Sequence, residues 1–127
     1  FSQIDVYRSL AALTGAEVPA TAAPDSRDCL PVLLGEGQSD REYVVQQNLN
    51  NTLAIISGPW KYLEPSDGPA LEFWTKTELG NSPEPQLYDL TADPREQHNV
   101  AAEHPEVVAE LAARLAEVRG AVASTVQ

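Results

Sequence analysis

The sequence predicts an α+β fold, in which one long C-terminal helix packs on a small antiparallel sheet of four strands, after a separate N-terminal helix. Three observations lead to this prediction. Four short segments rich in β-branched and aromatic residues lie between residues 42 and 90. Apolar residues with helical spacing follow Pro105, and a second helical pattern occupies residues 2–14.

The N-terminal helix is predicted from its caps and its apolar spacing. Ser2 is a predicted N-cap, and Asp5 three positions later forms a variant of the capping box. Gly15 is well placed to end the helix, because glycine accepts a left-handed backbone at no steric cost. The apolar side chains recur on one face: Ile4, Tyr7, Leu10 and Leu13.

The segment after this helix is predicted to be mostly loop. Residues 16–28 are rich in Pro, Ala and Ser without an apolar period, and residues 35–40 form a second loop. Between them, Leu30 to Leu34 is a short apolar piece. We expect one helical turn there, docked by its leucines.

The four strands are expected at residues 42–47, 53–56, 60–63 and 87–90. The first two form a hairpin, because the asparagines of the 48–52 turn tolerate a left-handed backbone. Gly58-Pro59 turns the chain into the third strand. Residues 64–86 hold four of the ten prolines, and loops of this length inside a compact domain are usually functional or mobile.

The last helix is predicted to start at Pro105, after a turn at Asp93–Glu96. Glu110 and Arg114 are spaced to form an ion pair on its exposed flank. Its apolar stripe, which must pack on something, consists of Val108, Leu111, Leu115, Val118 and Val122.

Composition excludes several classes of partner. Nineteen acidic against eight basic side chains give a net charge of −11, which repels phosphate backbones and anionic lipid, so we expect no nucleic acid and no membrane partner. One Cys and two His argue against a disulfide framework and a structural zinc site. Composition leaves the compartment open.

The tract from Leu87 to Ala101, which reads LYDLTADPREQHNVA, resembles the closing segment of the sulfatase family, which joins the last strand to the last helix. Three further segments resemble the family, in the family's order: residues 4–15, 25–35 and 54–62. In the first of them, Arg8 and Ser9 replace the usual Pro-Thr, and in the third, Ile56 replaces a common Arg.

The resemblance implies a large α/β catalytic domain followed by a smaller C-terminal one. Residues 1–40 would then be the end of the catalytic domain with its connecting loops, including a leftover helix, and residues 41–127 the C-terminal subdomain. Sulfatases hydrolyse sulfate esters with a formylglycine made from Cys or Ser and with a calcium ion. Both are implied for a longer parent protein. In the family, the residue converted to formylglycine and the residues that bind calcium and sulfate precede the segment that matches residues 4–15. This chain would therefore carry no catalytic residue and no cofactor.

Several residues with reactive or metal-binding side chains are predicted to have structural roles. Cys29 almost begins a formylglycine signature, but Leu33 stands where that signature requires Arg, so we expect a buried, inert thiol. His98 and His104 flank the turn into the last helix without enough further ligands for a metal. No catalytic residue and no metal ligand is predicted.

Substrate binding is predicted for exposed polar and aromatic residues of the turns and the long loop. Exposed aromatics in a loop offer a platform for a sugar or aryl group. Lys61 has two interpretations, since strand alternation places it opposite Trp60 and Tyr62, either solvated or facing the catalytic domain. The candidates are Asn48, Asn50, Lys61, Trp74 and Lys76.

The resulting prediction is a C-terminal fragment of a sulfatase-like hydrolase that is itself non-catalytic, packs on the missing catalytic domain and helps to shape the substrate mouth. The start at Phe1 rather than Met fits a cut fragment. Such a fragment would leave helix 2–14 without a docking site, and self-association through the exposed interface is an expected consequence. The alternatives are a tail of a phosphonate or phosphodiester hydrolase and a free-standing acidic interaction module. Periplasmic, secreted and cytoplasmic bacterial locations all stay open.

Overall fold

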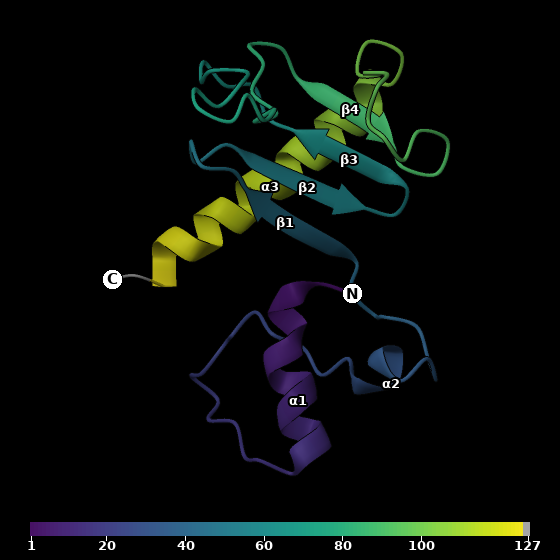
Figure 1. Cartoon of the computed structure of the whole chain (residues 1–127), viewed down its shortest axis with the longest axis vertical. Helices are drawn as coiled ribbons and strands as arrows, with labels where there is room; N and C mark the ends of the chain where they lie inside the picture. The colour runs from purple at the N-terminus through teal and green to yellow at the C-terminus, as the bar shows by residue number, and fades with distance from the viewer. Residues whose placement is uncertain (126–127) are drawn as a thin grey trace. The chain divides into compact units, whose positions relative to one another are not determined.

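The computed structural model of the chain describes residues 1–125, with side chains as far as residue 120. The chain forms two compact units, Phe1–Arg41 and a second that begins at Glu42 (Figure 1). None of the described helices has both the length and the apolar character needed to cross a bilayer.

The first unit contains a 3-10 turn, η1 (Gln3–Asp5), followed by helix α1 (Val6–Thr14) and the short helix α2 (Leu30–Leu33). The predicted N-terminal helix is therefore confirmed, with its first turn wound more tightly. The Ser2 amide donates to the Asp5 carboxylate at 3.2 Å, as the predicted capping box requires. Gly15 ends α1 with φ of 71°, a backbone conformation that glycine adopts without strain.

Helix α1 buries a polar face. Asp5 and Ser9 are fully buried, and Ser9 Oγ accepts a 2.8 Å hydrogen bond from the Cys29 amide while donating to the Asp5 carbonyl at 2.7 Å. Ser26 Oγ accepts from the Arg8 amide at 3.2 Å. Hydrogen bonds from and to side-chain hydroxyls, rather than apolar contacts, thus join α1 to the segment that follows it. Each of these buried polar groups has a hydrogen-bond partner.

The centre of this unit is an ion pair between Asp5 and Arg41. The guanidinium donates through both Nε and Nη2 to the carboxylate, and Nη2 also donates to the Asp25 carbonyl at 2.8 Å. Burial on its own would raise the pKa of Asp5, but the hydrogen bonds from Arg41 and from the amides of Arg27 and Ser2 outweigh burial and lower it. The same pair raises the pKa of Arg41, chiefly through its hydrogen bond to Asp5.

The leucines contribute less to docking the short helix than expected. Leu30 is half-buried, but Leu33 and Leu34 are exposed, whereas Cys29, which precedes α2, is 2% exposed. The hydroxyl of Ser9 fixes the Cys29 amide, so this hydrogen bond and the buried thiol hold the start of α2 in place. The predicted burial of Cys29 is confirmed.

The second unit is built on one antiparallel sheet in the order β1-β2-β3-β4, which confirms the predicted α+β fold class. The strands are β1 (Tyr43–Gln47), β2 (Leu53–Ser57), β3 (Trp60–Leu63) and β4 (Gln86–Asp89). Gln47 pairs with Leu53 across the first hairpin, and Asn51 in the connecting turn has φ of 63°. An asparagine in the left-handed region is what the Asn-rich turn predicts.

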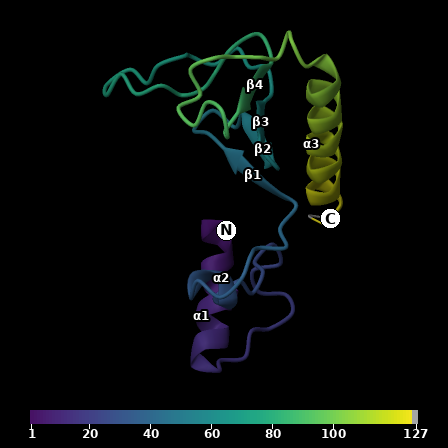
Figure 2. The ribbon, with the colours of Figure 1, turned by 90° about the vertical axis from the view of Figure 1, so that its right-hand side faces the viewer.

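Helix α3 (Pro105–Thr125) covers one face of this sheet (Figure 2). The predicted stripe residues Leu111 and Leu115 are buried in the core, Val108 packs against it, and the side chain of Val122 lies outside those described. Trp60 completes this face beside His104, with ring centroids 5.0 Å apart. The fully buried core consists of Ile55, Tyr62, Leu87, Leu111 and Leu115.

The segment between β3 and β4 extends from the sheet on the side opposite to α3 (Figure 2). Gly80 of this segment approaches Leu63, and the Gln86 side chain donates to the Gly80 carbonyl at 2.8 Å. The Tyr88 hydroxyl donates to Gln86 Oε1, also at 2.8 Å. The base of the long segment is therefore fixed against the sheet, and its middle projects away.

Candidate functional site

The middle of the long segment is a small hairpin rather than an irregular loop. Leu71 and Glu78 form an antiparallel bridge, which is flanked by two further backbone hydrogen bonds. The Glu72 amide donates to the Thr77 carbonyl at 2.8 Å, and the Leu79 amide donates to the Ala70 carbonyl at 2.9 Å. These bonds hold the tip, residues 73–76, in a defined position.

Glu72 braces the tip through its side chain. One carboxylate oxygen, Oε2, accepts from the Trp74 amide at 2.6 Å and from the Thr75 hydroxyl at 3.0 Å, and also from the Thr75 amide. The hydrogen bond from the Thr75 amide is the main reason that the pKa of Glu72 is lowered. The carboxylate stays ionised and orders the turn from within.

The tip presents two aromatic rings and a cation to solvent. Phe73 is 71% and Trp74 84% exposed, and their rings meet edge to face with centroids 4.9 Å apart. Lys76 has φ of 57° and places its Nζ 5.0 Å from the centroid of the Phe73 ring. We name Phe73, Trp74 and Lys76 the aromatic tip.

The two asparagine candidates are engaged within the unit. Asn48 donates to the Leu79 carbonyl and to Asn81 Oδ1, both at 2.9 Å, and its own oxygen accepts from the Asn50 and Thr52 amides. Asn50 accepts from Asn81 at 3.3 Å. Their side chains therefore tie the β1–β2 turn to the long segment.

Asn81 is the buried centre of this network. Its Oδ1 also accepts from the hydroxyls of Thr52 and Ser66, at 2.8 and 3.1 Å. A Cβ added at Gly68 would lie 2.7 Å from its Nδ2, so a glycine is needed where the two segments touch. Nothing in the sequence pattern singled out Asn81, because one asparagine among several in a polar loop carries no periodic signal.

Lys61 pairs with Glu96, a residue 35 positions later, at 2.6 and 2.8 Å from its two carboxylate oxygens. Glu96 has φ of 55°, a left-handed backbone that turns its side chain toward β3. The pair joins two of the segments that carry the family resemblance, residues 54–62 and 87–101. Lys61 lies opposite Trp60 and Tyr62, as alternation predicts, but it is partly buried rather than fully solvated.

The tract before α3 is fixed by two short polar side chains. Asp93 accepts from the His98 and Gln97 amides at 2.8 and 2.7 Å, and the His98 amide is the main cause of its lowered pKa. Asn99 Oδ1 accepts from the Leu87 and Ala101 amides, both at 3.0 Å. The predicted turn at Asp93–Glu96 is confirmed, and its acidic residues have structural partners.

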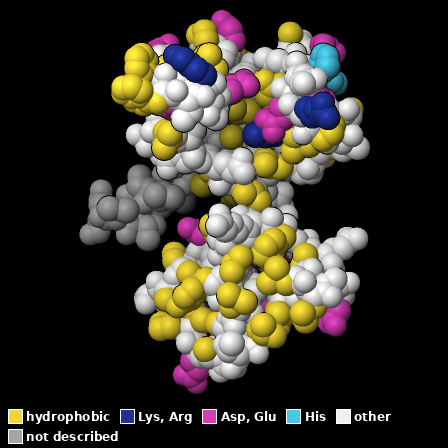
Figure 3. All heavy atoms as spheres, in the orientation of Figure 1, with side chains coloured by type: hydrophobic (Ala, Val, Ile, Leu, Met, Phe, Trp, Pro, Cys, Tyr) yellow, Lys and Arg dark blue, Asp and Glu magenta, His cyan; other side chains and the backbone are white. Residues whose placement is uncertain are grey.

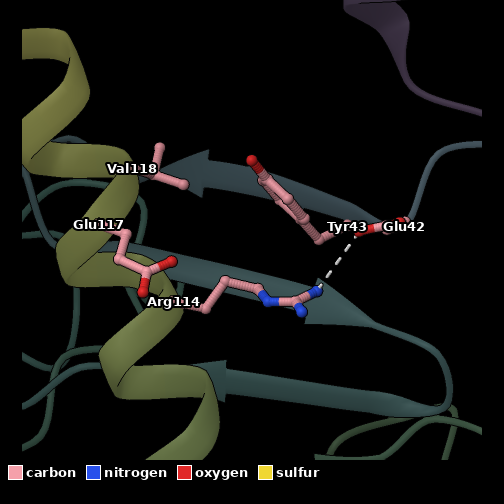
Figure 4. A pocket seen from close by; sticks show the side chains of 5 residues that line it. All are labelled: Glu42, Tyr43, Arg114, Glu117 and Val118. Carbon is pink, nitrogen blue, oxygen red and sulfur yellow. Dashed lines mark ion pairs between the residues drawn. The ribbon is translucent and has the colours of Figure 1, made fainter.

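A shallow hollow of about 320 Å³ lies between β1 and α3, lined by Glu42, Tyr43, Arg114, Glu117 and Val118 (Figure 4). Arg114 reaches across it, 3.9 Å from Glu42 and 5.6 Å from the centre of the Tyr43 ring. The helix ion pair expected between Glu110 and Arg114 is thus replaced by a contact with β1. Within the described part of the chain, no three His, Cys, Asp or Glu side chains gather to hold a metal.

Comparison with known sequences places these features in a family, although no family model matches the chain. An N-acetylgalactosamine-6-O-sulfatase from Bacteroides thetaiotaomicron is 62% identical over 94% of this chain and 23% of the relative. Human arylsulfatase A is 32% identical over 84% of this chain and 24% of the relative. The chain spans about a quarter of the length of these curated relatives.

Solved structures support the same family relationship. One from a glycosaminoglycan-metabolism locus of Bacteroides thetaiotaomicron is 62% identical and has a TM-score of 0.86 over 94% of this chain and 25% of its own. The phosphonate monoester hydrolase of Agrobacterium radiobacter shares the fold, with 22% identity and a TM-score of 0.53 over 91% of this chain and 24% of its own. By sequence and by fold, the chain is a homologue of the sulfatase family, matching about a quarter of each relative.

Proposed function

We propose that this chain is the C-terminal part of a hydrolase of sulfuric esters and that it contains none of the reacting groups itself. The proposal is supported by the 62% identity to an N-acetylgalactosamine-6-O-sulfatase. From that relative we infer a sugar substrate that bears a 6-O-sulfate on N-acetylgalactosamine. Residues 1–40 would then end the catalytic domain, and residues 41–127 would form the C-terminal subdomain.

The calcium ion and the formylglycine belong, in this proposal, to the parent protein. The described residues do not fit either group. Cys29 is buried and is followed at the fifth position by Leu33, where the modification signature needs Arg. No cluster of metal-ligating side chains is present among the residues described. We therefore assign no chemical step to this chain.

The proposed role of the chain is supported mainly by the exposed apolar face of α1. Its four stripe residues, Ile4, Tyr7, Leu10 and Leu13, are between 46% and 58% exposed, while the opposite face buries Asp5 and Ser9. Hydrophobic side chains gather over this unit in Figure 3. Covering half of one such side chain contributes about 1 kcal/mol, so the stripe favours an apolar partner.

The occupant we assign to this stripe is the catalytic domain of the parent, because the chain spans only about a quarter of its relatives. The rest of each relative supplies a large surface of the same polypeptide. The turn and the long segment of the second unit are proposed to shape the substrate mouth through Asn48, Asn50, Lys61, Trp74 and Lys76. Of these, Trp74 and Lys76 are the most available to a ligand, because the other three have partners within the unit.

The experiment compares the protein encoded by the native gene with the 127-residue chain. Its mass is measured intact, and sulfate release is measured on a 6-O-sulfated N-acetylgalactosamine oligosaccharide and on a small aryl sulfate. The proposal expects a several-fold larger protein that releases sulfate and a short chain that releases none. A native mass of 13.7 kDa would contradict it and favour a free-standing acidic interaction module.

The second candidate is a phosphonate or phosphodiester hydrolase, favoured by the shared fold of the Agrobacterium enzyme. A phosphonate monoester assayed beside the sulfate esters separates the two, since they differ in substrate and not in architecture.

Sedimentation of the short chain tests self-association. If α1 is a contact surface, the chain alone should form dimers or bind a dye for apolar surface, and the parent should do neither.

A further inference from the structure

We propose that the aromatic tip is a carbohydrate subsite, in which Trp74 stacks on a sugar ring and Lys76 lies beside an anionic substituent of the same glycan. The inference deepens the proposed function and rests on it for the identity of the glycan. It concerns binding outside the reacting centre, so neither residue is given a part in the chemistry.

The exposure of Trp74 first indicates a ligand. At 84% exposed, it is the most exposed of the large apolar side chains in the described part of the chain. A tryptophan side chain that stays exposed to water loses a larger favourable free energy of burial than any other side chain would. The adjacent Phe73 is also exposed, at 71%, so the two rings contact each other instead of packing into the unit. The two rings stand at 89° to each other, so the flat surface on offer to a ligand is the face of the indole, with the Phe73 ring beside it.

The tip is also preorganised. The Glu72 carboxylate accepts hydrogen bonds from the Trp74 and Thr75 amides, and the Leu71–Glu78 bridge closes the hairpin beneath them. The edge-to-face contact with Phe73 then limits the rotamers of the indole. A surface that is ordered before the ligand arrives loses less entropy on binding, which favours affinity at a small contact area.

Lys76 gives the tip its charge. Its left-handed backbone, with φ of 57°, is unfavourable for a residue with a Cβ, and the 3.1 Å hydrogen bond from its amide to the Glu72 carbonyl holds it. The conformation brings Nζ over the Phe73 ring, 5.0 Å from its centroid. In a chain with a net charge of −11, a cation held beside an exposed aromatic surface is complementary to an anionic, ring-shaped ligand.

Sugars and nucleobases both stack on indoles, and the net charge of −11 repels the phosphates of a nucleotide as it repels a sulfate, so charge does not separate the two. The proposed function, a hydrolase of sulfated sugars, favours the sugar. The C–H face of a pyranose matches the negative face of the indole, and a sulfate or carboxylate on the ring matches the ammonium. A contact of the tip with another domain of the parent is the alternative that the experiment must separate.

The experiment uses the protein encoded by the native gene and a tetrasaccharide that contains N-acetylgalactosamine, in 6-O-sulfated and desulfated forms. Calorimetry with the desulfated form measures binding without any turnover. We expect Trp74→Ala to weaken this binding about tenfold, equivalent to about 1.4 kcal/mol, and Trp74→Phe to retain most of it. Leu34→Ala is the matched control, because Leu34 is a large apolar side chain that is 55% exposed in the first unit and has no proposed part in binding, and it should change nothing.

The sulfated form tests Lys76. Lys76→Ala should raise the KM for the sulfated tetrasaccharide about threefold, leave kcat unchanged and lose its effect at high salt, as expected for an exposed ion pair. Arg95→Ala, which removes the same charge from another exposed loop, is the control. Neither tip variant should alter hydrolysis of a small aryl sulfate.

The outcomes separate this inference from the proposed function. If the protein hydrolyses no sulfate ester but still binds the tetrasaccharide through Trp74, the function is wrong and the subsite stands. If Trp74→Ala binds the tetrasaccharide as tightly as the unaltered protein, the subsite is overturned. The subsite is also overturned if Trp74→Ala lowers thermal stability and impairs both substrates equally, because the tip would then be a contact between domains.

Discussion

The two units of this chain bury opposite kinds of side chain. The second unit has an apolar core, in which Leu87 and Ile55 of the sheet meet Leu111 and Leu115 of α3. The first unit buries Asp5 and Ser9 and leaves the apolar stripe of α1 in water. Because burial of apolar surface is the dominant favourable term in folding, the second unit has its own source of stability and the first depends on paired polar groups.

The difference indicates which of the two units can cover its own apolar surface. A sheet with one face closed by a long helix satisfies the usual requirement for a two-layer fold. A helix with a buried polar face and an outward apolar face does not satisfy it. We propose that α1 is a helix of a larger core, held to its own loop by hydrogen bonds and to the rest of that core by its stripe.

The largest expected effect lies in the core of the second unit. Leu87→Ala removes a side chain that is 0% exposed and should lower the free energy of unfolding by about 4 kcal/mol, since the cavity adds to the lost transfer energy. Urea unfolding of the 127-residue chain, followed by circular dichroism, measures it. Leu49→Ala is the control and should change stability by less than about 0.5 kcal/mol. Equal losses for the two variants would mean that the sheet and α3 do not form one core.

The next effect concerns the polar centre of the first unit. Asp5→Asn keeps the shape of the side chain but removes the charge that faces the buried guanidinium of Arg41. We expect a loss of about 2 kcal/mol, the typical worth of hydrogen bonds to charged groups. Hydrogen exchange of the α1 amides reports this unit separately from the sheet. Unchanged protection of α1 would show that the ion pair contributes nothing.

Acid provides a second test of the same pair. Because the folded pKa of Asp5 is lowered, its contribution is present above the unfolded value of about 3.9 and is lost as pH falls through the folded value. Protection of α1 should therefore fall below about pH 4 in the unaltered chain. In Asp5→Asn this step should be smaller. A step of the same size in both would assign the acid sensitivity to other carboxylates.

A smaller effect is expected at the Lys61–Glu96 pair, which joins β3 to the turn before α3. Lys61 is 17% and Glu96 33% exposed, so the pair is partly screened. Lys61→Met should cost about 1 kcal/mol. A double-mutant cycle with Glu96→Gln measures the coupling between the two side chains, and additive effects would mean that the contact carries no energy.

The smallest effect is expected at the stripe of α1 in the isolated chain. Leu10→Ser replaces a leucine that is half exposed and should lower the stability of the 127-residue chain by about 1 kcal/mol at most, because only half of its surface is covered there. It should also reduce dye binding and self-association. A loss of about 2 kcal/mol or more would mean that the stripe is already packed within this chain.

Much of the fold could be predicted because it follows local rules. Segments rich in β-branched and aromatic residues placed the four strands, Pro105 marked the start of α3, and the Asn-rich turn contained the left-handed Asn51. Gly15 ended α1 where predicted. The family tract was readable because its structural residues stand close together in sequence, as Asp93 and Asn99 do.

The rest could not be predicted, because it depends on partners far apart in sequence. Lys61 and Glu96 are 35 positions apart, and the role of Glu96 needs a positive φ that glutamate rarely adopts. Asp5 and Arg41 are 36 apart. The aromatic tip was only half predicted: Trp74 and Lys76 were candidates, but the bracing carboxylate of Glu72 has no periodic signature. The burial of a polar face by α1 also contradicts the usual direction of an amphipathic helix.

We propose that the stripe of α1 is covered in the intact protein. The most direct measurement is the stability effect of Leu10→Ser in the 127-residue chain and in the protein encoded by the native gene, measured by the same unfolding assay. We predict a loss of about 1 kcal/mol at most in the short chain and a loss of about 2 kcal/mol or more in the longer protein, as for a buried leucine. Equal losses in both would contradict the proposal, because the stripe would then be as exposed to solvent in the intact protein as in the short chain.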